Sequence, residues 1–295
     1  MMRPLSDQTR GTLLVVAAVL VLSIQGLIIR WICVDRWTLI FWRGFFMFLS
    51  LSIVLIICWR GQTCSRFLAI GWTGVIAAAI LAVNNILFLS AFTLTSIANT
   101  LVITDSAPLL VALLSWLILR EKVPGRTWIA ILVGMGGIVV IFHGSLTGGS
   151  LAGDLCAFGA AVILAAYLIF LRHAKKINMI PSLALSGLLT TFFVLPMANP
   201  LSISFSDLGL CFLAGGGILA FGMGLITLAP RYIPATEVSL ILLLEVVLGS
   251  TWAWIVLEEI PATESLLGGA VVIGALACNS LAGWKSCRAV KTSNN

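Results

Sequence analysis

A few charged side chains interrupt the otherwise apolar segments of this sequence. Asp105 and Glu245 each lie near the middle of such a segment, and Arg43 lies nearer the end of another. An ionisable group costs roughly 2.5–3.5 kcal/mol in hydrocarbon on insertion scales, so it requires a partner or a task. These side chains could bind the charged ends of a zwitterion, or a carboxylate could carry a proton that drives transport.

Other interpretations of the same residues stay open. Arg43 and Asp105 could form a buried ion pair that only stabilises the fold. Asn84 and Asn85 are adjacent, so on a helix their side chains point about 100° apart and only one should face a cavity. Tyr167 and Trp254 could stack on a substrate or close an outer gate, but lipid-facing or packing roles fit them equally well. The substrate-binding candidates are Asp105, Glu245, Arg43, Asn84, Asn85, Tyr167, Gln25 and Trp254.

Pro108 lies in the same apolar segment as Asp105. A proline in mid-helix lacks the N–H of the hydrogen-bond ladder and permits a kink. Such a kink beside Asp105 would suit gating, and static packing is the alternative.

The sequence indicates no metal site and no cofactor. His143 and His173 lie on opposite sides of the expected topology, and the seven cysteines form no CxxC pair. No G-x-x-x-x-G-K-[ST] sequence is present, so ATP binding of that kind is not predicted. No nucleophile or metal cluster points to an enzyme. Energy for transport would come from an ion gradient or from the substrate's own gradient.

The composition indicates an integral membrane protein. Hydrophobic residues make up 60% of the chain and charged residues 9%, with a mean hydropathy of +1.14, whereas soluble domains carry roughly 25% charged residues. The apolar runs have the length of membrane helices and lack the alternation of barrel strands. We predict an all-α integral membrane protein with ten transmembrane helices, near residues 11–31, 38–58, 67–90, 96–119, 127–143, 153–171, 180–199, 208–229, 237–256 and 263–284.

Most of the 17 Lys and Arg residues fall at alternate ends of these helices. By the positive-inside rule, this predicts a multi-pass protein of the inner membrane with both termini in the cytoplasm. The basic residues are scattered singly, so the net charge of +6 does not indicate nucleic-acid binding. The loops on the opposite side are expected to carry the acids Asp154, Asp207, Glu258, Glu259 and Glu264.

Two stretches of the sequence match at a constant offset. Each contains a helix that ends in E-x-x-P and leads into a glycine-rich helix. The matching pairs are Ala98 with Ala235, Glu121 with Glu258, Pro124 with Pro261, and Gly137 with Gly274. Five helices per half would insert the second copy in the opposite orientation. We therefore predict a five-plus-five inverted repeat, with helices 1–5 in residues 1–147 and helices 6–10 in residues 148–295. Inverted repeats are typical of alternating-access transporters.

Several of these motifs carry a resemblance to a known family. They are Thr95 and Ala98, Ala235 and Glu237, Pro108, "LILREKVP" at 117–124, "EVVLG" with "WIVLEEIP" at 245–261, and Arg43 within "LIFWRGFFMFL". The sequence resembles the EamA-type members of the drug/metabolite transporter superfamily. The resemblance implies ten helices in a five-plus-five inverted repeat, and its characterised bacterial members often export amino acids or related metabolites. Gln25-Gly26 departs from the aromatic dipeptide that many members have, and Ser250 stands where proline is common.

The sequence thus predicts a secondary active transporter that exports amino acids or related small metabolites by alternating access. An importer, or a carrier of a nucleotide derivative, a quaternary amine or a drug, remains an alternative, and a channel is a further one. The expected partners are a small-molecule substrate, a coupled proton or other ion, and membrane lipid. The substrate, the direction of transport, the coupling ion and the oligomeric state are left open.

Overall fold

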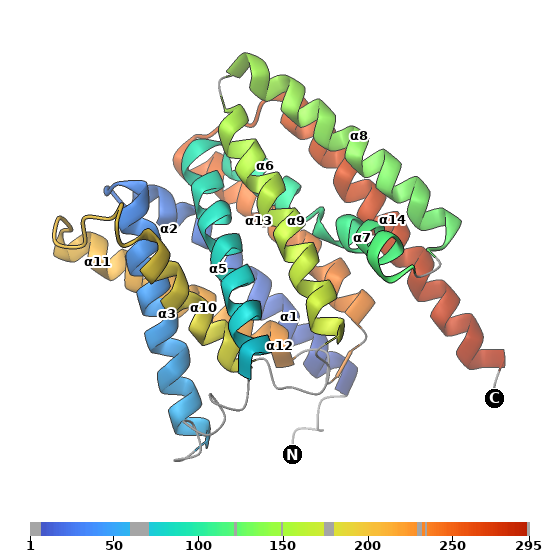
Figure 1. The fold of residues 1–295 in the computed structure, drawn as a ribbon. Helices are drawn as coiled ribbons and strands as arrows, with labels where there is room; N and C mark the ends of the chain where they lie inside the picture. Colours follow the sequence, from blue (N-terminus) through green and yellow to red (C-terminus); the bar gives the residue numbers. More distant parts are fainter. Residues whose placement is uncertain are drawn as a thin grey trace, which may run out of the picture.

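The computed structural model describes residues 7–59, 71–120, 123–148, 150–173, 180–228, 232–233 and 235–293, and these ranges contain helices but no strand (Figure 1). The first half comprises α1 (Asp7–Ser23), α2 (Gln25–Trp31), α3 (Arg36–Trp59), α5 (Gly71–Leu94), α6 (Ile97–Thr104), α7 (Ala107–Leu119) and α8 (Gly125–Gly148). The second half comprises α9 (Leu151–His173), α10 (Ile180–Val194), α11 (Phe205–Phe212), the π-helix η1 (Leu213–Leu219), α12 (Ala220–Leu228), α13 (Ala235–Leu257) and α14 (Thr263–Ser293).

The lengths and hydropathy of these helices are those of a multi-pass membrane protein. Within the described residues, seven helical segments are long and apolar enough to span a bilayer: Gln8–Trp31, Arg36–Trp59, Gly71–Leu94, Ile97–Ile118, Gly125–Leu146, Leu151–Phe170 and Phe205–Ile226. Three shorter apolar helices are Pro181–Val194, Ile241–Leu257 and Thr263–Asn279. Together these helices overlap each range predicted from the sequence.

One face of α8 exposes apolar side chains on the outside of the helix bundle. Ile129, Leu132 and Val139 are 65%, 71% and 62% exposed, a pattern that would be unfavourable in water and is stable against acyl chains. The all-helical membrane fold predicted from composition is confirmed.

Three apolar segments are not continuous α-helices. Ile24 separates α1 from α2, Asp105 and Ser106 separate α6 from α7, and η1 interrupts the segment from α11 to α12. At the first break the Ser23 hydroxyl donates to the Leu20 carbonyl at 3.0 Å, a back-bond that bends helices. Discontinuous helices at membrane depth are a feature of transporter binding sites.

Pro108 lies in the first turn of α7 rather than in the middle of a kinked helix. Proline has no backbone N–H to donate to the Thr104 carbonyl, and its ring would clash with that carbonyl. The helix therefore ends at Thr104, and a new helix begins at Ala107. The expectation of a mid-helix kink is therefore corrected to a helix break that places Asp105 at the junction.

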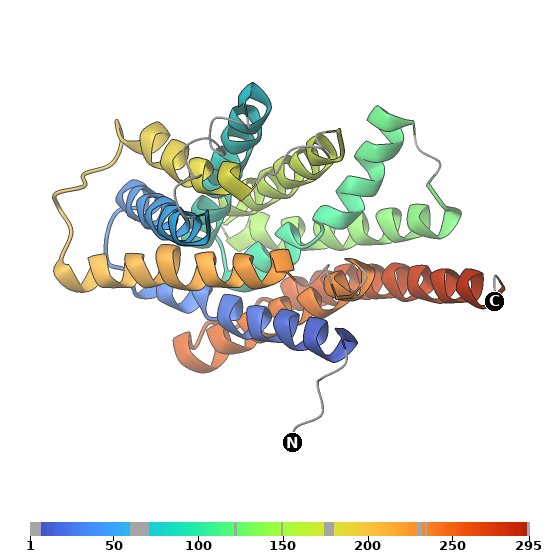
Figure 2. The same ribbon diagram turned by 90° about the horizontal axis from the view of Figure 1, so that it is seen from below.

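Close glycine contacts fix two of the helix pairs. A Cβ on Gly44 of α3 would lie 2.9 Å from the Gly187 carbonyl of α10, and a Cβ on Gly137 of α8 would lie 2.7 Å from the Gly268 carbonyl of α14. Glycine lets two backbones approach this closely. Figures 1 and 2 show α8 and α14 side by side along one edge of the molecule. Elsewhere α5 packs on α9 and α10, and α13 packs on α1, α6 and α14.

The acids that were expected in loops are only partly found in loops. Asp154 lies in the first turn of α9 and is 0% exposed, so its assignment to a loop was wrong. Asp207 and Glu264 likewise lie in the first turns of α11 and α14. Several residues behind the predicted orientation and repeat lie outside the described residues: Arg3, Arg60, Arg66, Glu121, Lys122, Lys175, Lys176 and Arg231.

Candidate functional site

Asp105 lies at the break between α6 and α7. Its backbone N–H donates to the Leu101 carbonyl at 2.9 Å and closes the last turn of α6. Its side chain is half-buried, and within the described part of the chain it has no hydrogen-bond or ion-pair partner. The junction thus presents an unpaired carboxylate between two helix ends, where backbone groups also lack helical partners.

Glu245 lies on α13, which packs directly against α6. It is also half-buried and without a hydrogen-bond or ion-pair partner among the described residues, and Asp105 is close enough to act on it electrostatically. One turn further along α13, Gly249 lies against Leu101 of α6, and a Cβ there would be 3.6 Å from the Ser23 carbonyl at the α1–α2 break. The structure therefore brings together two of the predicted site residues, beside both broken helices.

Arg43 is 2% exposed on α3. Its Nη2 donates to Oε1 of Gln25 at 3.0 Å, while its buried Nε has no partner among the described residues. Arg43 and Asp105 form no ion pair, so the structural pair considered from the sequence is not present. Arg43 and Gln25 instead link α3 to the start of α2, and the guanidinium keeps one free donor in a buried position.

The remaining candidates are spread over the bundle. The Asn84 amide donates to the Ala160 carbonyl at 2.7 Å and joins α5 to α9, while Asn85 is half-buried with no such bond among the described residues. Tyr167 is buried against Ala77 and Leu81, which gives it a packing role between α9 and α5.

Trp254 is 59% exposed and lies nine residues beyond Glu245, about 13 Å along the helix axis. No contact between described residues joins Tyr167 or Trp254 to the two carboxylates.

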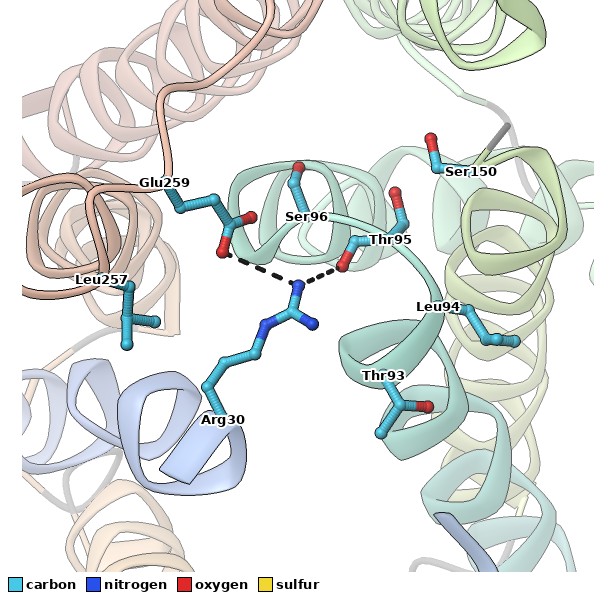
Figure 3. Close-up of a pocket in the computed structure, with 8 residues that line it drawn as sticks. All are labelled: Arg30, Thr93, Leu94, Thr95, Ser96, Ser150, Leu257 and Glu259. Carbon is cyan, nitrogen blue, oxygen red and sulfur yellow. Dashed lines mark hydrogen bonds and ion pairs between the residues drawn. The ribbon is translucent and has the colours of Figure 1, made fainter. Parts of the chain in front are cut away.

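A pocket of about 670 Å³ opens where α2, α5 and α13 end and α6 and α9 begin. Figure 3 shows the residues that line it: Arg30, Thr93, Leu94, Thr95, Ser96, Ser150, Leu257 and Glu259. Arg30 crosses the pocket, with Nη2 2.7 Å from the Thr95 carbonyl and 3.7 Å from Oε2 of Glu259. The pocket therefore contains both signs of charge and several hydroxyl groups.

Glu259 also accepts a hydrogen bond from the backbone N–H of Ile97 at 2.9 Å. Ile97 is the first residue of α6, where the helix dipole favours a negative charge. Arg30 and Glu259 thus join α2, the α5–α6 turn and the segment between α13 and α14. The sequence prediction missed Arg30, because an arginine at the end of the first predicted helix looks like a cation that only flanks the helix. The prediction assigned Glu259 to a loop.

Comparison with known proteins assigns the chain to a family. The family model described as "EamA-like transporter family" matches twice, over residues 9–143 and 151–281. The chain therefore contains two copies of the family's repeat. A solved structure titled "Crystal structure of protein" superposes with a TM-score of 0.61 at 18% identity, covering 92% of this chain and 97% of that chain. This similarity shows the fold alone. No curated protein matches the chain.

Proposed function

Because the chain belongs to the EamA-like transporter family, whose members are membrane transporters, we propose that it is a secondary active transporter that exports amino acids or related small metabolites by alternating access. The observation that carries the proposal is a pair of neighbouring carboxylates that have no partner among the described residues: Asp105 at the α6–α7 break of the first repeat and Glu245 on α13 of the second. Transporter sites typically lie at repeat interfaces beside discontinuous helices.

The proposed architecture is ten transmembrane helices in a five-plus-five inverted repeat, in the inner membrane with both termini in the cytoplasm. The packing supports this arrangement. Helices in corresponding positions of the two halves cross each other: α3 meets α10 at Gly44 and Gly187, and α8 meets α14 at Gly137 and Gly268. A two-fold axis between the halves would produce such contacts, because each equivalent helix meets its own counterpart there.

The polar groups without partners on α3, at the α6–α7 break and on α13 suit a substrate with both charges. The two carboxylates can accept hydrogen bonds from an ammonium group. On α3, the buried Nε of Arg43 has no partner among the described residues and is a donor of the kind that binds a carboxylate. Asp105 or Glu245 could also carry a coupling proton, since both are half-buried and have no partner among the described residues. An amino acid meets both requirements, which is why we place it before amines, drugs and nucleotide derivatives.

The experiment is counterflow in proteoliposomes. Vesicles preloaded with one unlabelled amino acid are diluted into its labelled form, and protein-free vesicles serve as the control. Saturable, transient accumulation above equilibrium is expected, because a carrier exchanges substrate across the membrane. A linear, conductive flux would indicate a channel, and accumulation of only amines or nucleotide derivatives would overturn the amino-acid assignment.

A further inference from the structure

Arg30 and Glu259 are the charged residues among those described that line the pocket at the ends of α2, α5 and α13. Their side chains are 31% and 24% exposed, so a molecule in the surrounding solvent can reach both. Nη2 of Arg30 and Oε2 of Glu259 lie 3.7 Å apart, which is longer than a hydrogen bond. The two side chains therefore attract each other without a direct hydrogen bond.

Separate backbone groups hold the two charges in place. The Thr95 carbonyl accepts from Nη2 of Arg30 at 2.7 Å, and the Ile97 N–H donates to Oε1 of Glu259 at 2.9 Å. Thr95 lies in the turn between α5 and α6, and Ile97 begins α6. Because each side chain has its own backbone partner, the cation and the anion can keep their places when a ligand lies between them.

Each side chain also keeps polar atoms that a ligand could bind. Among the described residues, Nε and Nη1 of Arg30 and Oε2 of Glu259 have no hydrogen-bond partner. In Figure 3 one guanidinium nitrogen of Arg30 points towards the side of the pocket formed by Thr93 and Leu94. A guanidinium group binds a carboxylate through its N–H groups, and a carboxylate accepts from an ammonium group.

The charge balance of the pocket favours a zwitterion. An anion bound at Arg30 alone would be repelled by Glu259, and a cation bound at Glu259 alone would be repelled by Arg30. A molecule that carries a carboxylate and an ammonium group close together satisfies both residues. No other charged residue among those described lines the pocket, while Leu94 and Leu257 provide apolar surface for a side chain.

We propose that this pocket binds a free amino acid with an uncharged side chain, with the carboxylate on Arg30 and the ammonium group on Glu259. The volume of about 670 Å³ lies within the range of roughly 300–1,000 Å³ that is usual for small-molecule sites. The inference rests on the proposed function and adds a second site to it, since Asp105, Glu245 and Arg43 do not line this pocket. In the proposed orientation the pocket opens on the outer side, where an exporter releases its substrate.

The two charges belong to different repeats. Arg30 falls in the first match to the family model, over residues 9–143, and Glu259 falls in the second, over residues 151–281. Alternating access moves one repeat against the other, so the gap between the two charges would change during the cycle. A ligand held by both charges would lose one contact when they separate. Contacts between partly exposed charges are weak, which suits a release site.

The test is thermal unfolding of the purified Glu245→Gln variant, which lacks one of the two central carboxylates, with leucine as the probe. A ligand that binds only the folded state raises the unfolding temperature with a saturable concentration dependence. Leucine is expected to do so in the millimolar range. Isocaproate, which lacks the ammonium group, and isoamylamine, which lacks the carboxylate, should bind at least about tenfold more weakly.

Further substitutions in the same Glu245→Gln protein locate the binding. Glu259→Gln keeps a hydrogen-bond acceptor and removes the charge, so it should fold and bind leucine at least about tenfold more weakly. Its control is Glu258→Gln, because that neighbour does not line the pocket. Arg30→Gln should weaken binding as Glu259→Gln does. Its control is Arg36→Gln, which removes an arginine at the same end of the bundle but outside the pocket. Both controls should keep the affinity of the parent protein.

Equal leucine affinity of Glu259→Gln and Glu258→Gln would overturn the site, and so would the absence of any leucine effect. Isocaproate binding as tight as that of leucine would overturn the choice of a zwitterion. If Arg30→Gln does not fold, the two glutamate variants decide the question.

The outcome can be separated from that of the counterflow experiment. Counterflow together with unchanged leucine affinity in the pocket variants would contradict this inference alone. Leucine binding that depends on Arg30 and Glu259, without counterflow, would contradict the proposed export alone.

Discussion

Asp105 and Glu245 have side chains that the fold encloses but leaves without a partner among the described residues. Most buried polar groups in proteins are hydrogen-bonded, and an exception in a membrane protein points to a ligand or a proton. Their mutual proximity adds a like-charge repulsion that a cationic group or a proton would relieve. The two carboxylates are therefore the residues where a conservative change should separate transport from folding.

Replacing Glu245 by Gln keeps the shape of the side chain and removes its charge. We expect Glu245→Gln to lower transport at least about tenfold, equivalent to losing an interaction of ~1.4 kcal/mol. Thermal stability should stay the same or rise, because a half-buried charge without a partner among the described residues is gone. Flux in proteoliposomes and thermal unfolding of the same preparation measure the two effects.

The matched control is Glu258→Gln, since Glu258 is exposed just beyond the end of α13. This variant should transport like the wild type. Wild-type flux of Glu245→Gln at every pH tested would remove Glu245 from the proposed site.

The break between α6 and α7 is the element that positions Asp105. The helix ends at Thr104 because Pro108 can neither donate to nor pack against its carbonyl. The Ser106 hydroxyl donates to the Ile103 carbonyl at 2.6 Å and satisfies one of the groups that the break exposes. Helix ends with partly free backbone groups are suited to binding charged ligands and to moving between conformations.

Restoring the missing N–H should close this break. In Pro108→Ala the backbone amide regained at this position can donate to the Thr104 carbonyl, so we expect a continuous helix and a stability gain of at most about 3 kcal/mol. Transport should fall, because Asp105 would become part of a regular helix. Thermal unfolding and flux measure the two changes. Pro124→Ala, in the segment before α8, serves as the control and should leave flux unchanged. Full flux in the Pro108 variant would show that the break is not needed for function.

At the scale of the whole molecule, two close helix crossings join the halves. Gly137 of α8 faces the Gly268 carbonyl of α14 at a distance that excludes a side chain. The neighbouring Gly136 has open space around its Cβ position. The two glycines lie in the same helix, but only Gly137 contacts α14, so they make a matched pair for substitution.

Gly137→Ala and Gly136→Ala should have opposite effects. In Gly137→Ala the added methyl group would meet the Gly268 backbone and Val272, so α8 and α14 must separate and the unfolding temperature should fall. Gly136→Ala should raise the unfolding temperature slightly, because alanine favours the helix and should add up to about 1 kcal/mol to the free energy of unfolding. Equal behaviour of the two variants would contradict a tight crossing at Gly137.

Hydropathy alone was sufficient to predict the helical membrane fold, because the bilayer admits few structures and sets their length. It also singled out Asp105 and Glu245 as candidates, since charges are rare in such segments, and their role in transport stays a prediction. It was insufficient for Arg30, Glu259 and Asp154. These three residues lie near the ends of apolar segments. A charge there could lie in a solvated loop at no desolvation cost, so the sequence does not mark it as unusual. Only the tertiary packing shows which of the three is buried or paired.

The reciprocal glycine contacts also bear on how such a chain could have arisen. Two separate copies of a five-helix protein, inserted in opposite orientations, would meet through the same pairs of helices, each copy offering the same surface to the other. The short link between α8 and α9 would then be the only covalent addition needed to turn a dimer into one chain. In such a fused chain the two copies could then diverge: at the constant offset of the repeat, Asp105 corresponds to Leu242 and Glu245 to Pro108, so neither carboxylate has an acidic counterpart in the other copy.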